Sequence, residues 1–419
     1  MVALGVRPTS HRAVLAMLLT ACGGRAPAPA SSPVDEAQAA AELPAADRED
    51  VSAWASPLVP DIEPYPGTTG LSASRCADCH AEIAAEWAAS THAHAWVDPQ
   101  FQAELRKDPE IGWICLNCHT PLQAQLPERV TYRGSVRAAP RTPNPTFDAT
   151  LRDEGITCLS CHYRPEGIAS VHEDVAAPHP TVYAPELRDA ETCTRCHEAQ
   201  AQVEATLICT FSTGTEWTEA APGRTCPDCH MPRIVRSHAT GAPEREGGRH
   251  LWPGSLLPKD AWSATEAAMF ASWAPGTEAR LELPTAATAG EETSATLHVQ
   301  NTRAGHKLPT GDPERHYVLT LRARDANGIL LAEEMKRIGQ VWEWWPEARR
   351  LADERLPAGG STSLVLHWRQ GPTPVAVEAT VEHVRISDEN ASHHDLGSYP
   401  RRRVVHEEHA VVAPTTVPQ

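Results

Sequence analysis

Five copies of one short pattern constrain this 419-residue chain more than any other feature of its sequence. The pattern is Cys-x-x-Cys-His, and it occurs at 76–80, 115–119, 158–162, 193–197 and 226–230. Histidine fills 21 of the 419 positions. A histidine directly after each of five such cysteine pairs would arise by chance with odds of about 3 in ten million, so the repetition has a chemical cause.

This pattern is the attachment sequence of c-type haem. The two thiols form thioethers with the vinyl groups of the porphyrin, and the adjacent imidazole then binds the iron. We therefore expect five covalently attached haem c groups. The attachment residues would be Cys76, Cys79, Cys115, Cys118, Cys158, Cys161, Cys193, Cys196, Cys226 and Cys229. The proximal iron ligands would be His80, His119, His162, His197 and His230.

Structural zinc is the alternative reading of the cysteine pairs. Zinc knuckles place a second pair about 12–20 residues after the first, and they need no histidine after every second cysteine. Here the motif histidines at 80, 119, 162, 197 and 230 are separated by steps of 39, 43, 35 and 33 residues. The spacing favours haem.

The composition indicates how such a region would fold and what it would bind. Aromatic residues make up only 5% of the chain, so we expect porphyrin faces to form much of the core between 76 and 230. The formal net charge is −17, which argues against nucleic acid as a partner. It favours docking onto basic patches of other redox proteins, such as cytochromes or quinol-linked membrane complexes.

The first 21 residues are predicted to be a signal peptide of the lipoprotein type. Arg7 and Arg12 precede an apolar run at 13–21 that is too short to span a bilayer. The run ends before Cys22 in a sequence that resembles a lipobox, so Cys22 is the predicted lipidation site and membrane anchor. An ordinary cleavable signal with an incidental cysteine is the alternative. Both predict the cell envelope, and Gly23 favours an outer-membrane lipoprotein, periplasmic or surface-exposed.

The rest of the chain divides into segments that differ in composition and sequence pattern. Residues 22–70 are rich in Pro and Ala and suit a disordered tether. We expect a pentahaem cytochrome domain of short helices and loops over 71–255, with a helix at 81–89, and a linker over 256–275. Alternating apolar and polar residues over 276–415, with a hairpin turn at Asn327-Gly328, predict an antiparallel β-sandwich domain.

The sixth ligand of each iron decides the chemistry, because a second histidine favours electron transfer and an open position admits small molecules. If 80–92 is one helix, His92 lies about 18 Å from His80 and must serve a neighbouring haem. His94 is nearly opposite His92 around such a helix, so we expect one of the two to bind iron. Cys209 stands outside the motifs, as a small buried residue, an intermolecular bridge or an axial ligand.

The residues around the first motif resemble the multihaem cytochrome c-554 family. The shared features are Cys76, Cys79, His80, Trp87, Ser90, His92 and Ala93. The phrases GITCLSCH at 155–162, CPDCHMP at 226–232 and RHLWPGS at 249–255 also resemble multihaem cytochromes. AGHKLPTG at 304–311 is similar to a phrase of cytochromes with an all-β tail. The resemblance covers about 71–255 strongly and the tail weakly.

The resemblance implies haems packed in a chain, mostly with two histidine ligands each. It favours His92 over His94 as a distal ligand, and it also favours His172 and His250. His306 is a further candidate, reaching in from the sandwich. For the remaining site the candidates are His179, His238 and His316.

Three functions fit these expectations. The first is electron transfer between redox partners in the cell envelope, by a carrier without a substrate of its own. The second is a haem-based oxidoreductase that acts on nitrite or hydroxylamine at a five-coordinate haem. Pentahaem nitrite reductases use Lys in place of one motif histidine, and every motif here ends in His. The third is a structural subunit of a cytochrome filament or surface complex.

Overall fold

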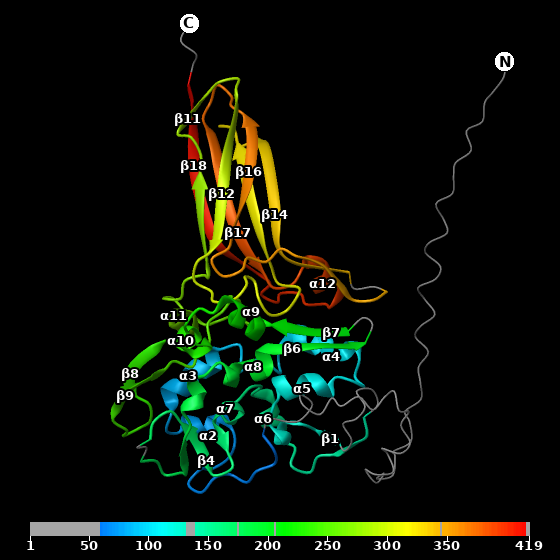
Figure 1. The fold of residues 1–419 in the computed structure, drawn as a ribbon, viewed down its shortest axis with the longest axis vertical. Helices are drawn as coiled ribbons and strands as arrows, with labels where there is room; N and C mark the ends of the chain where they lie inside the picture. The colour runs from blue at the N-terminus through cyan, green and yellow to red at the C-terminus, as the bar shows by residue number, and fades with distance from the viewer. Residues whose placement is uncertain (1–58, 131–138, 174–175, 205–206, 344–345, 416–419) are drawn as a thin grey trace, which may run out of the picture.

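The computed structural model describes residues 59–130, 139–173, 176–204, 207–343 and 346–415. The predicted signal peptide, Cys22 and most of the predicted tether lie outside these residues. Within the described ranges, no helix has the length and apolar character that a membrane span requires. The chain forms a motif region, 59–275, which contains the five motifs, and a sheet region, 276–415, which stands on one end of it (Figure 1).

Short helices dominate the motif region. They are α2 (Ala73–Ala77), α3 (Ala81–Ala89), α4 (Pro99–Lys107), α5 (Trp113–His119), α6 (Ala149–Asp153), α7 (Leu159–His162), α8 (Glu191–His197), α9 (Thr213–Ala220), α10 (Cys226–His230) and α11 (Ala264–Met269), with 3-10 turns η2 (Gln123–Gln125) and η3 (Pro185–Arg188). Four of these helices end on a motif histidine. A helical turn suits the motif because residues three apart project from one side. The predicted helix at 81–89 is confirmed as α3.

Small β elements join the helices, where only loops were expected. They are β1 (Glu128–Val130) with β2 (Arg141–Pro143); β3 (Tyr163–Arg164), β4 (Gly167–Ser170) and β5 (Thr181–Tyr183); β6 (Glu198–Glu204) with β7 (Leu207–Ser212); and β8 (Arg233–Ser237) with β9 (Glu244–Gly248). Most of these strands have only two to five residues, too few to show a clear alternation, whereas β6 has seven residues that alternate polar and apolar side chains. Their turns carry several side chains to the haem sites.

The sheet region contains nine strands. They are β10 (Thr277–Glu282), β11 (Ala286–Thr288), β12 (Glu292–Asn301), β13 (His316–Arg324), β14 (Leu330–Glu343), β15 (Arg349–Asp353), β16 (Ser361–Arg369), β17 (Val375–Val384) and β18 (Arg402–Thr415). One sheet has the order β10-β12-β16, and the other β11-β18-β17-β13-β14-β15. Leu297 and Leu366 from the first share one apolar core with Leu319 and Val381 from the second. Alternate residues of each strand fill this core because side chains point to opposite faces in turn.

This region has the predicted hairpin, and it differs from the expected antiparallel β-sandwich in two details. The predicted hairpin is confirmed, since Gly328 adopts φ +80° in the turn between β13 and β14. The prediction of purely antiparallel strands is wrong at one place, because β11 pairs in parallel with β18. The two sheets are also unequal, with three and six strands.

The segment 256–275, expected to be a linker, is packed onto the motif region. Ser263 and Glu266 form a capping box that begins α11. Leu256 and Phe270 are buried with Ala89 of α3. This packing holds the sheet region in place instead of leaving it on a loose connection.

Ion pairs and apolar contacts join the two regions. Arg355 pairs with Glu216 of α9 at 2.5 Å, and both side chains are buried. Ala103 of α4 packs against Ala391 of α12 (Asp388–His393), at the base of the sheets. The loop before β13, which carries His306, is thereby held over the haem motifs.

Candidate haem sites

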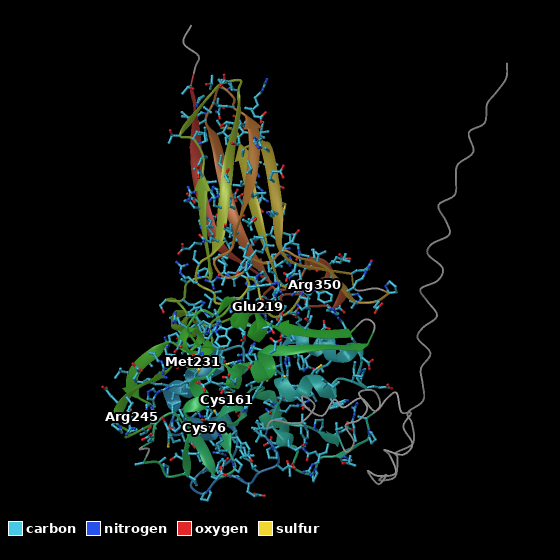
Figure 2. The ribbon with its side chains drawn as sticks, viewed as in Figure 1. Cys76, Cys161, Glu219, Met231, Arg245 and Arg350 are labelled. Atoms are coloured by element: carbon cyan, nitrogen blue, oxygen red, sulfur yellow. The ribbon has the colours of Figure 1, made fainter. Side chains whose placement is uncertain are left out.

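One continuous cavity of about 1760 Å³ extends through the motif region to the base of the sheets. It is larger than the roughly 300–1,000 Å³ of an ordinary ligand pocket. Its walls include the two cysteines and the histidine of four motifs, namely Cys76, Cys79, His80, Cys158, Cys161, His162, Cys193, Cys196, His197, Cys226, Cys229 and His230. Cys76 and Cys161 both lie among the helices and small hairpins of the motif region (Figure 2). The residues of the second motif are not among the lining residues. We number the sites one to five in the order of their motifs.

Cysteines of different motifs lie close together. Cys76 and Cys158, Cys118 and Cys196, and Cys193 and Cys226 lie near enough for each thiol to shift the pKa of the other. The first links sites one and three, the second links two and four, and the third links four and five. Cys161 of site three lies near enough to Cys193 of site four to raise its pKa. The five sites are therefore contiguous, and no disulfide is formed by the described cysteines.

Backbone carbonyls orient four of the motif histidines. Nδ1 of His80 lies 2.7 Å from the His238 carbonyl oxygen. The same contact joins His119 to Ala95 at 2.8 Å, His162 to Ala169 at 2.8 Å and His230 to Pro253 at 2.6 Å. An Nδ1–H that donates to a carbonyl leaves Nε2 as the electron-pair donor, which is the arrangement of a metal-binding imidazole.

Three motif histidines each face a second histidine from a distant part of the chain. Ring centroids are 6.2 Å apart for His197 with His92, 6.1 Å for His162 with His250, and 6.2 Å for His230 with His306. Metal–nitrogen bonds of about 2.0 Å on both sides of one ion separate two imidazole centroids by roughly 6 Å. The three pairs therefore have the spacing that an iron between them requires.

Burial keeps these imidazoles neutral. It lowers the pKa of His92 to about 3 and the pKa values of His197 and His250 to about 4, with neighbouring histidines adding to the effect. The pKa of His306 is also lowered, mainly by burial. Neutral imidazole is the form that binds a metal, so no proton has to leave before ligation.

At site one two candidates lie beside each other. The ring centroids of His172 and His238 are 6.5 Å apart, and both residues line the cavity. Nε2 of His238 lies 3.0 Å from the Arg245 carbonyl within its own hairpin, so that nitrogen is engaged by protein. His179 also lines the cavity, with its Nδ1 3.3 Å from the Pro180 carbonyl oxygen.

Site two is built differently from the others. The ring of Phe101 stacks on His119, with centroids 3.6 Å apart and planes at 3°. Burial lowers the pKa of His119 to about 4, and Lys259, which is ion-paired with Asp98, adds to the effect. Burial and the nearby thiols of the second motif raise the pKa of Cys209 to about 12, so Cys209 is a neutral thiol beside site two.

Two further candidates lie away from the motif histidines. His94 bonds to the Ser90 carbonyl at 2.9 Å and faces a separate small pocket beside Lys259. His316 begins β13 and bonds to the Glu314 carbonyl at 2.8 Å. Helix α3 ends at Ala89, so His92 and His94 stand in a turn and not on the longer helix that the sequence suggested.

Two residues at the sites were not found from the sequence. Glu86 is 3% exposed and accepts a hydrogen bond from the His250 backbone N–H at 2.8 Å, together with bonds from two arginines. Trp252 lies edge-on to both His92 and His250, at centroid distances of 4.6 and 5.3 Å. Trp252 stands in the RHLWPGS phrase, but nothing in the sequence links Glu86 to a segment more than 160 residues away.

Comparison with solved structures gives an informative likeness. No protein-family model matches the chain, and no curated protein matches it. The structure resembles the penta-heme cytochrome c552 from Thermochromatium tepidum, with a TM-score of 0.59 and 18% identity, covering 83% of this chain and 100% of that one. The CARDB domain of the PF1109 protein from Pyrococcus furiosus matches 33% of this chain and 87% of its own, with 13% identity and a TM-score of 0.19.

The first likeness shows the fold, which is that of a multihaem c-type cytochrome. At 18% identity it does not extend to function. The second likeness is too slight for any conclusion. Membership of the cytochrome c-554 family stays a prediction.

Proposed function

We propose that this protein is an electron-transfer cytochrome that carries five haem c groups. The observation that carries the proposal is the set of three imidazole pairs, His92–His197, His162–His250 and His230–His306, at 6.1–6.2 Å. When bound, haem c supplies an iron that exchanges one electron, with little rearrangement if both axial positions hold imidazole. With imidazole in both axial positions of the iron, those three sites would have no open coordination position for a substrate.

The chain's own residues would hold the haems as follows. The ten motif cysteines would anchor the porphyrins and the five motif histidines would be proximal ligands. His92, His250 and His306 would be the distal ligands of sites four, three and five. At site one we favour His172, which lines the cavity and which the resemblance to multihaem cytochromes also favours.

The contacts between motifs support a continuous route for electrons. Site four lies beside site two at Cys118 and Cys196, and beside site five at Cys193 and Cys226. Site three lies beside site four at Cys161 and Cys193, and beside site one at Cys158 and Cys76. Site four would therefore be the branch point, joined to three neighbours.

The partners and the location follow from charge and from the N-terminus. A formal charge of −17 supports brief docking onto basic patches of other cytochromes or of quinol-linked membrane complexes. Lipidation at Cys22 would tether the protein to a membrane in the cell envelope, and we favour the outer membrane. Assembly into a filament remains a separate proposal, without a specific contact to support it.

A second candidate function rests on site two. There the ring that packs on His119 is that of Phe101, among the described residues, whereas at three other sites a histidine faces the motif histidine. A haem held by His119 alone would have an open position for a small nitrogen compound such as nitrite or hydroxylamine.

Spin-state spectroscopy on exported, haem-loaded protein separates the two candidates. The electron-transfer proposal predicts low-spin iron at sites three, four and five, with spectra that carbon monoxide does not change. A single high-spin haem that binds nitrite and turns it over would favour the oxidoreductase. High-spin iron throughout would contradict the electron-transfer proposal.

A further inference from the structure

A group of polar side chains lines the haem cavity where the sheet region meets the motif region. Its members are Arg315, Tyr317, His383 and Arg385, and all four line the cavity. Tyr317 on β13 and His383 on β17 are directly opposite in the antiparallel register. Their rings therefore share one face of the sheet, with centroids 4.8 Å apart. We call these four residues the basic pocket.

The ring nitrogens of His383 have no hydrogen-bond partner among the described residues. The residue is 4% exposed. The Ser255 backbone lies beside the ring, without hydrogen-bond geometry. Burial lowers the pKa of His383 to about 3, so the ring is neutral, with one N–H donor and one acceptor. A buried polar group without a partner costs about 1–3 kcal/mol, which indicates that a partner is bound there.

Tyr317 lies beside His383 in the basic pocket. It is 5% exposed and lines the cavity, and its hydroxyl makes no hydrogen bond in the part of the chain that the structure describes. Burial raises the pKa of Tyr317 above its ordinary value, so the hydroxyl keeps its proton and can donate it. The basic pocket thus offers two neutral donors to an acceptor in the cavity.

The two arginines give the pocket a positive charge. Among the described residues, neither forms an ion pair with a carboxylate. Arg315 donates to the Thr310 carbonyl at 3.3 Å. Arg385 donates to the carbonyls of Leu257, Pro258 and Pro400 and lies over the Tyr399 ring. Carbonyls satisfy N–H groups without neutralising them, so both charges remain in a protein whose net charge is −17.

The basic pocket lies beside site four, and Lys259 connects it to site two. The Arg315 guanidinium contributes to lowering the pKa values of both His197 and His383, so it stands near each of them. Arg315 and Arg385 both help to lower the pKa of Lys259, which in turn acts on His119. Asp98 offsets part of this charge, but its carboxylate is already held by Lys259 and Tyr399.

We propose that the basic pocket binds a planar oxyanion, either a carboxylate or a small inorganic oxyanion such as nitrite. Guanidinium groups match two oxygens of such an anion with paired N–H donors. The Tyr317 hydroxyl and the His383 N–H add two neutral donors. The anion has two sources of the same chemistry. One is a haem propionate from site two or four, which rests on the proposed function, and the other is a free anion from solution.

The experiment compares exported holoprotein with Arg315→Gln and Tyr317→Phe variants. Arg322→Gln on the same strand is the control, since Arg322 is half-exposed and pairs with Glu333. Nitrite binding is measured by calorimetry, and the potential of each haem by a spectroscopic redox titration. If Arg315→Gln does not fold, Tyr317→Phe carries the test, because it removes a single hydroxyl.

Two results support the pocket and identify the source of its anion. If the anion is free, nitrite binds to wild type and binding weakens about tenfold or more in both variants. If the anion is a propionate, nitrite does not bind, but the potential of one haem falls in Arg315→Gln and shifts in Tyr317→Phe. Unchanged potentials and no nitrite binding, with normal haem content and low-spin spectra, would overturn the pocket and leave the electron-transfer proposal intact.

Discussion

The rings of His306 and His230 lie 6.2 Å apart with their planes at 13°. His306 precedes β13 in the sheet region, while His230 ends α10 in the motif region. The sheet region would thus complete a haem site in addition to packing on the motif region. Replacement of His306 tests this role at a single site.

His306→Ala should convert one haem from low-spin to high-spin and open it to carbon monoxide, because the imidazole that faces His230 is removed. Electron paramagnetic resonance and carbon monoxide difference spectra measure the change. His409→Ala is the control, since His409 is exposed on β18. Identical spectra for His306→Ala and wild type would show that His306 is not a ligand.

Glu86 should control both stability and the potential of site three. Its buried carboxylate joins Arg236 at 2.8 Å, Arg249 at 2.7 Å and the His250 N–H. Glu86→Ala removes the buried carboxylate from Arg249 and leaves Arg236 with only the exposed Glu82, so we expect a loss of about 3 kcal/mol in unfolding free energy. The extra positive charge should also raise the potential of the haem at site three.

The matched control for Glu86 is its helical neighbour Glu82. Glu82 also pairs with Arg236, but its side chain is 75% exposed. Glu82→Ala should change stability by less than about 1 kcal/mol and leave the potential unchanged. Equal effects of the two substitutions would contradict a special role for the buried carboxylate.

The contact between Arg355 and Glu216 should hold the two regions together. Both side chains are 3% exposed and meet at 2.5 Å. Arg355→Met leaves Glu216 buried without its partner, which should cost about 3 kcal/mol. If the contact between the sheet region and the motif region positions His306, Arg355→Met should lower the temperature of thermal unfolding. On heating, the high-spin signal of site five should then appear before those of the other sites. Arg303→Met, at an exposed pair with Glu278, should do neither.

Lys259 should make the potential of site two depend on pH. Burial lowers its pKa from 10.5 to about 8, and Asp98 opposes this shift. Arg385 and Arg315 lower the pKa further, and the Lys259 ammonium also donates to the Tyr399 hydroxyl. Between pH 8 and 10.5 the unfolded chain binds more protons, so the Lys259 contribution to unfolding free energy rises with pH. The loss of positive charge near His119 above about pH 8 should lower one haem potential.

Potentiometric titration at several pH values measures this dependence. Lys259→Met should abolish the change near pH 8, while Lys107→Met, at an exposed pair with Glu104, should keep it. If the haem potential still changed with pH near 8 in Lys259→Met, the titrating group would be another residue.

The sequence predicted those parts of the sites that depend on local spacing. The motif helices, α3 and the turn at Asn327-Gly328 each follow from residues within a few positions of one another. His92, His250 and His306 were chosen from local phrases, and the structure brings each one to a motif histidine. Their ligation of iron stays a prediction.

Long-range contacts set the remaining features. His80 is oriented by a carbonyl 158 residues away, and Glu86 bonds to a backbone N–H 164 residues away. The pairing of Tyr317 with His383 depends on the register between β13 and β17, which alternation alone does not fix. Phe101 on His119 likewise depends on how α4 packs, and no local pattern at 99–107 indicates it.

The most direct test is the mass and spectrum of protein exported through a haem-attachment system. The account predicts the mass of the mature polypeptide plus five haems, a red colour, and low-spin iron at three or more sites. A colourless product with the mass of the polypeptide alone would contradict it.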